Sequence, residues 1–152
     1  MSVIDYMIVK ALAGRKNVLE ALVQYAHGRI KPSEAYIYGV SKLQLKGAIE
    51  RIYAKAYSCT AALELVKRVA PIVIATVDPI IEVDGSYIPR CKICGVHMIS
   101  RNQVPIFPED HVVKRHMDIV KKHRDIVLSE LKRAGFLKTS SRQQSSERVQ
   151  VF

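Results

Sequence analysis

Residues 29–52 constrain the fold more than any other part of the chain, because they hold two helix signals separated by a tight turn. Pro32 suits the first turn of a short helix, where its missing N–H leaves no hydrogen bond unmade. Gly39 ends that helix, since glycine adopts the left-handed conformation at little cost, and Ser41 caps a second helix. Apolar residues recur at helical spacing along this second helix: Leu45, Ala48, Ile49 and Ile52. We therefore predict two short helices that pack across a turn.

The opposite face of the second helix is basic and polar. Together with residues at the two helix starts, its side chains can contact phosphates and base edges. The candidate nucleic-acid contacts are Lys31, Ser41, Lys42, Gln44, Lys46 and Arg51.

The same segment resembles the two-helix unit of helix-turn-helix DNA-binding proteins. Ala35 supplies the small residue at the helix crossing, Gly39 the turn, and Val40 the apolar plug between the helices. Glu34 departs from the pattern, in which that position is usually apolar. The resemblance covers residues 29–52 and implies double-stranded DNA as the partner. The alternative is a helical hairpin in a protein that never binds nucleic acid.

A second motif is a Cys-x2-Cys pair followed by several histidines. Cys91 and Cys94 direct two thiolates at one point, and two histidines on one helix can complete a tetrahedral site. The set that we favour is Cys91, Cys94, His111 and His116. Its spacing, C-x2-C-x16-H-x4-H, resembles the C2H2 zinc finger, with a loop longer than the usual spacing of about twelve residues. The resemblance covers roughly residues 87–125 and implies a bound zinc ion.

Other ligand sets remain open in this region. His97 can replace either histidine of the favoured set. His116 and His123 lie two helical turns apart, about 10 Å on a straight helix, so they cannot both bind one zinc ion. The alternative to a metal site is a pair of buried cysteines with solvated histidines.

Pro108 places His111 in the first turn of its helix, because proline is compatible only with a helix that starts there or later. In the zinc finger the base-reading residues precede the first histidine on the helix, and here none remain. We therefore expect a structural zinc site that clamps a hairpin to the helix. No HExxH motif, glycine-rich phosphate loop or nucleophile constellation indicates an enzyme.

Composition and charge limit the class of protein. The net charge of +10 and the pI of about 9.7 favour a polyanionic partner, and 49% hydrophobic residues are enough for a core. Three cysteines, two of them in the Cys-x2-Cys pair, fit a reducing cytoplasm with metal and without disulfides. We expect Cys59 to be buried in an apolar helix. Without a signal peptide or a membrane-spanning apolar run, we expect a cytoplasmic protein.

Helical periodicity predicts the elements of the first half. Residues 3–12 form a helix that Gly14 ends, and a second helix opens at Lys16 or Asn17 and runs to residue 26, where Gly28 closes it. After the two-helix unit, Ser58 or Thr60 opens a helix that reaches about residue 69, before Pro71 breaks it. Residues 72–77 are β-branched and nearly all apolar, which predicts a strand.

A β-hairpin is predicted over residues 80–88, with strands at 80–83 and 87–88 and a turn at Asp84-Gly85. This hairpin is either a wing of the kind that follows a recognition helix in winged-helix proteins, or a small sheet that joins two modules.

A long helix is predicted from Glu109 to Ala134, stopped by Gly135. An apolar seam spaced at three and four residues runs along it, and Arg124 interrupts the seam. The seam residues are Val113, Met117, Val120, Val127, Leu131 and Ala134. Such a seam either packs on the first domain or pairs with a second copy in a homodimer. Residues 139–152 are predicted to be a flexible basic tail.

Together these features predict a mainly α-helical protein with a small β-hairpin, of the α+β class. We expect a helix-turn-helix domain over residues 1–78, winged if the hairpin is a wing, then a C2H2-like zinc element over 79–138 and the tail. The combination resembles small regulators of archaea and their viruses. It implies sequence-specific DNA binding, in transcription regulation or genome maintenance. The alternatives are an RNA- or ribosome-associated basic zinc protein, and a protein–protein adaptor that uses the long helix.

Overall fold

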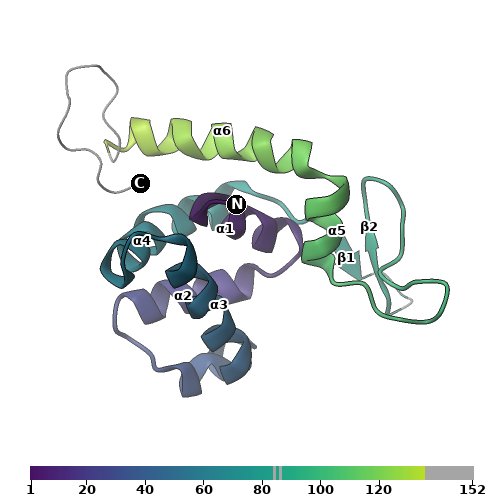
Figure 1. Ribbon diagram of the computed structural model, residues 1–152, viewed down its shortest axis with the longest axis horizontal. Coiled ribbons are helices and arrows are strands. Elements are labelled where there is room, and N and C mark those ends of the chain that lie inside the picture. Colours follow the sequence, from purple (N-terminus) through teal and green to yellow (C-terminus); the bar gives the residue numbers. More distant parts are fainter. Residues whose placement is uncertain (84, 86, 136–152) are drawn as a thin grey trace.

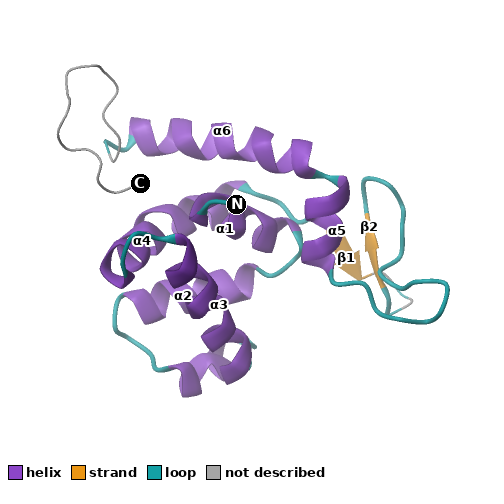
Figure 2. Ribbon diagram, in the orientation of Figure 1, coloured by secondary structure: helices purple, strands orange, loops and turns teal. Residues whose placement is uncertain are grey.

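The computed structural model describes residues 1–83, 85 and 87–135, and this part of the chain is mainly helical with one small sheet (Figure 1, Figure 2). In chain order the elements are α1 (Val3–Leu12), α2 (Lys16–Ala26), the 3-10 helix η1 (Pro32–Tyr38), α3 (Lys42–Lys55), α4 (Cys59–Thr76), β1 (Ile81–Val83), β2 (Pro89–Cys91), α5 (Pro108–Arg115) and α6 (Met117–Arg133). The expected α+β class is confirmed. The predicted tail at 139–152 lies outside the described residues.

Helix α1 is the centre of the molecule, because it contacts each of the other five α-helices (Figure 1). Its residues are apolar on nearly all sides, which is typical of a helix that is buried all round. Ser2 caps its start, since the Ser2 hydroxyl accepts a hydrogen bond from the N–H of Asp5. Gly14 ends it with φ +84°, at a point where a Cβ would lie 3.3 Å from the Ile81 carbonyl oxygen. Helices α1 and α2 have the ranges that periodicity predicts.

The prediction of a strand at residues 72–77 is wrong, because α4 continues through Pro71 to Thr76. Pro71 is solvent-exposed and interrupts one backbone hydrogen bond. On the other face, Val66, Val69, Val73 and Val77 are buried at helical spacing. The apolar burial of this helical face outweighs both the proline and the strand preference of a β-branched run. Cys59, the first residue of α4, is exposed and not buried as expected.

The predicted single helix from Glu109 to Ala134 is in fact two helices, α5 and α6, which meet at His116. The backbone of His116 leaves helical geometry, with φ −133° and ψ 33°. His111 and His116 are five positions apart, so on one straight helix their side chains would point about 140° away from each other. The break turns both rings to the same side. Their centroids lie 5.1 Å apart.

Helix α6 packs on α1 and α4 of its own chain. The seam residues Val120, Val127 and Leu131 are fully buried there. Arg124, which interrupts the seam, donates two hydrogen bonds to the Asp5 carboxylate, at 2.7 and 2.9 Å. The seam therefore packs on helices of its own chain, which is one of the two arrangements considered, and pairing with a second copy stays a prediction. The hydrophobic core is continuous across residue 78, the predicted domain limit.

The two-stranded sheet is an antiparallel hairpin in which Ile81 pairs with Cys91 and Val83 with Pro89. Its second strand begins at Pro89, after the predicted 87–88, and part of the predicted turn lies outside the described residues. The Ile80 N–H donates a hydrogen bond of 2.8 Å to the Leu12 carbonyl, which ties the hairpin to the end of α1. Figure 1 shows the hairpin beside α5. Its role, as a wing or as a sheet that joins two modules, stays a prediction. None of the described helices has both the length and the apolar character that crossing a membrane requires.

Candidate metal centre and nucleic-acid interface

The structure brings together the four residues predicted to bind a metal. Cys91 ends β2, and a turn carries Cys94 back toward it, with the Gly95 N–H donating to the Cys91 carbonyl. His111 lies in the first turn of α5, which begins at Pro108 as predicted, and His116 lies at the α5–α6 junction. The ligand atoms of Cys91, Cys94, His111 and His116 all lie within 4.8 Å of one another.

The distances within this cluster fit a tetrahedral metal ion. Nε2 of His116 lies 3.4 Å from Sγ of Cys91, and Nε2 of His111 lies 3.4 Å from Sγ of Cys94. In a tetrahedron with Zn–S near 2.3 Å and Zn–N near 2.0–2.1 Å, sulfur and nitrogen ligands are separated by roughly 3.6 Å. The arrangement can thus hold one ion with two sulfur and two nitrogen ligands.

The surroundings of the cluster favour metal binding. Cys91, His111 and His116 are buried, while Cys94 is exposed. Burial lowers the pKa of His111, and the nearby His116 and Arg115 lower it further. A lowered pKa favours the neutral imidazole, which is the form that binds a metal.

The other two histidines of this region lie outside the cluster. His97 is exposed, and its backbone forms an isolated bridge with Arg90. Nδ1 of His123 lies 3.0 Å from the Ile119 carbonyl oxygen, one turn earlier in α6. Among the described residues, the cluster therefore consists of the favoured set, without the substitution by His97 that the spacing left open.

An ion-pair network holds α5 against α1. The Glu109 carboxylate lies 2.7 Å from the Lys10 ammonium and 3.7 Å from Nε of Arg15. Burial raises the pKa of Glu109, but the hydrogen bond and charge of Lys10, together with Arg15, more than offset this and leave it below its ordinary value. Glu109 is thus held as a carboxylate that fixes α5, and with it His111, relative to the N-terminal helices.

The two predicted short helices form, the first as the 3-10 helix η1 and the second as α3. Gly39 has φ +73°, and Ala35 and Val40 are buried between the helices. Glu34, which departs from the resemblance, accepts a hydrogen bond of 2.8 Å from the Lys31 N–H and so caps η1.

Ser41 and Gln44 cap α3 together. The Ser41 hydroxyl accepts a hydrogen bond from the Gln44 N–H, and Oε1 of Gln44 accepts one of 2.8 Å from the Ser41 N–H. A bidentate base contact uses both the oxygen and the nitrogen of the amide, so it would compete with this cap. The S-x-x-Q spacing signals such a capping box, and our reading of Gln44 as a base contact missed that signal.

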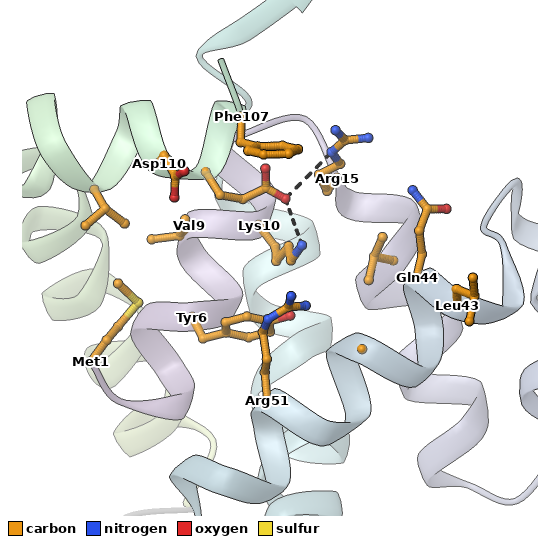
Figure 3. Close-up of a pocket in the computed structure, with 14 residues that line it drawn as sticks. Met1, Tyr6, Val9, Lys10, Arg15, Leu43, Gln44, Arg51, Phe107 and Asp110 are labelled. Carbon is orange, nitrogen blue, oxygen red and sulfur yellow. Dashed lines mark hydrogen bonds and ion pairs between the residues drawn. The ribbon is translucent and has the colours of Figure 1, made fainter. Parts of the chain in front are cut away.

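The remaining basic candidates divide into two groups. Lys42 and Lys46 are exposed one turn apart on α3, and Lys31 is exposed at the start of η1. Arg51 lies five positions beyond Lys46, about 140° further round the helix. Its side chain instead borders a groove between α3 and α1 (Figure 3).

Comparison with known proteins finds no match for this chain among family models, curated proteins or solved structures. The function is therefore inferred from the geometry of the two sites.

Proposed function

We propose that this protein is a sequence-specific DNA-binding protein, in transcription regulation or genome maintenance. In this proposal η1 and α3 form a helix-turn-helix unit, and α3 enters the major groove. The observation that carries it is the two-sided character of α3. One face buries Leu45, Ala48, Ile49 and Ile52, and the other exposes Lys42 and Lys46 next to a glycine turn. The net charge of +10 supports a polyanionic partner.

Selection from a random pool of DNA duplexes, followed by salt titration with the selected site, tests this function. The double variant Lys42→Gln/Lys46→Gln should weaken binding and reduce the salt slope by about 2, if each lysine contacts one phosphate. The matched control is Lys121→Gln/Lys122→Gln, which removes the same charge from the exposed face of α6. Unchanged DNA binding by the α3 variant, or displacement of the selected duplex from the parent protein by a structured RNA competitor, would rule out this interface.

We further propose that the Cys91, Cys94, His111 and His116 cluster binds a structural zinc ion. Two thiolates and two imidazoles are a ligand set that zinc prefers, and four protein ligands leave no open position for substrate. Such an ion would clamp the hairpin to the α5–α6 junction. Thiolate ligation is also consistent with a reducing compartment such as the cytoplasm.

Native mass spectrometry of the purified chain tests the zinc proposal. We expect one zinc ion per chain in the parent, and none in Cys91→Ser or Cys94→Ser. Cys59→Ser is the matched control, because Cys59 is an exposed cysteine outside the cluster. A parent protein that is folded and free of metal would contradict the proposal.

A further inference from the structure

A groove of about 630 Å³ lies between α1, α3 and the start of α5, apart from the metal cluster (Figure 3). Tyr6 and Lys10 of α1 line one side, Leu43 and Arg51 of α3 another, and Phe107 stands at the start of α5. Leu43 and Phe107 are 78% and 68% exposed. Together these two side chains give the groove apolar walls on two different elements. A volume of this size suits a small molecule.

Tyr6 gives the groove a polar end. The residue is 7% exposed, and its hydroxyl has no hydrogen-bond partner among the described residues that meets ordinary geometry. Arg51 lies close enough to interact with this hydroxyl. Buried polar atoms are nearly always paired, so an unpaired one that borders a groove indicates a missing acceptor or donor.

Both signs of charge line the groove beside Tyr6: Lys10, Arg15 and Arg51 are basic, and Glu109 and Asp110 are acidic. The ammonium groups of Lys10 and Lys55 lie 5.7 and 5.9 Å from the centre of the Tyr6 ring. Lys10 is paired with Glu109. Within the described part of the chain, no ion pair with a carboxylate is found for Arg51 or Lys55. A planar guanidinium fork beside a hydroxyl donor suits an anionic group with two oxygen acceptors.

We propose that this groove binds a small amphipathic anion. Its acidic group would accept hydrogen bonds from the Tyr6 hydroxyl and the Arg51 guanidinium, and its apolar body would lie between Leu43 and Phe107. The ligand would contact α3 and α5 at once and so link the basic helix to the metal-binding half. This binding site does not depend on the proposed DNA-binding function.

Fluorescence titration of the full zinc-loaded chain with 8-anilinonaphthalene-1-sulfonate tests the site, because this probe joins an aromatic body to one acidic group. We expect saturable binding of one probe per chain. Arg51→Gln should weaken it by roughly tenfold or more, the effect of losing a charge-assisted hydrogen bond. Arg101→Gln is the matched control, since Arg101 is an exposed arginine outside the groove.

Tyr6→Phe provides a second readout that a purely structural tyrosine would not give. It should weaken probe binding several-fold, while the free protein keeps or raises its melting temperature, because an unpaired buried hydroxyl has been removed. The uncharged analogue N-phenyl-1-naphthylamine should bind more weakly than the sulfonate and be insensitive to Arg51→Gln. Equal binding of both probes, or equal affinity of the sulfonate for the parent and Arg51→Gln, would overturn the proposal.

Discussion

Gln44 shows how one side chain can be assigned two different roles. Its position on the exposed side of α3 suggests a base contact, but its amide oxygen caps the helix through the Ser41 N–H. A cap of this kind satisfies a backbone donor that the helix itself leaves unpaired. Its loss should therefore first affect stability.

We predict that Gln44→Ala lowers the free energy of unfolding by about 1 kcal/mol, as removal of helix caps commonly does. Chemical denaturation measures this change. Gln44→Glu is the control, because glutamate can close the same capping box and should retain most of the stability. If Gln44→Ala is as stable as the parent, the cap contributes nothing.

The Tyr25 and Tyr53 hydroxyls form a contact of 3.5 Å between α2 and α3. The hydrogen bond with Tyr25, together with burial, raises the pKa of Tyr53 from 10.0 to about 12. Because the folded-state pKa is the higher one, the stabilisation is complete below pH 10 and is lost as the pH rises toward 12. Ultraviolet titration should show the pKa of Tyr53 falling toward 10 in Tyr25→Phe. Tyr57→Phe, at a residue that is 97% exposed, should leave it unchanged.

At the scale of elements, α4 is a helix that carries a proline in its interior. Pro71 is exposed, so its replacement removes no packing. We predict that Pro71→Ala raises the free energy of unfolding by about 1 kcal/mol, because the backbone N–H returns and the steric clash is relieved. Urea unfolding gives the value. If residues 72–77 were a strand after a proline break, the same substitution would give no such gain.

The packing of α6 on α1 involves an ion pair between Arg124 and Asp5, in which only the Asp5 side chain is largely buried. Asp5 is 5% exposed, whereas the Arg124 side chain is about a third exposed. We predict that Arg124→Ala costs about 2 kcal/mol, because it leaves the Asp5 carboxylate buried without its cation. Adding Asp5→Asn should recover part of this loss in a double-mutant cycle. A cost within about 0.5 kcal/mol would place the pair among weak surface ion pairs.

The elements differ in how far the sequence could predict them. Helices α1 and α2 follow from apolar periodicity and a following glycine, which are local signals. The secondary structure of residues 72–77 depends on which residues pack against Val73 and Val77 in the folded chain, and no local sequence pattern contains that information. The break at His116 has no proline or glycine to announce it. The break allows two histidines that are five positions apart to face the same pair of cysteines.

At the scale of the whole molecule, the cluster of Cys91, Cys94, His111 and His116 is joined to the helical core through α5, α6 and Glu109. We predict that Cys91→Ser lowers the melting temperature, with Cys59→Ser unchanged, because zinc binding contributes folding free energy. Hydrogen exchange should locate the effect. Amides of β1, β2 and α5 should lose more protection than those of α2, which packs mainly on α4, α3 and α1. Equal loss throughout would show that the chain opens only as one unit.

The junction at His116 also sets the direction of a long helix. Helix α6 has 17 residues, so it extends about 25 Å beyond this junction. A change of ten degrees at the junction would move the far end by about 4 Å, enough to withdraw Leu131 from the place that it fills completely. The His116 side chain at this junction belongs to the candidate metal cluster. Coordination of the proposed ion would therefore fix the His116 imidazole and, through it, the position of a helix face that lies several turns away.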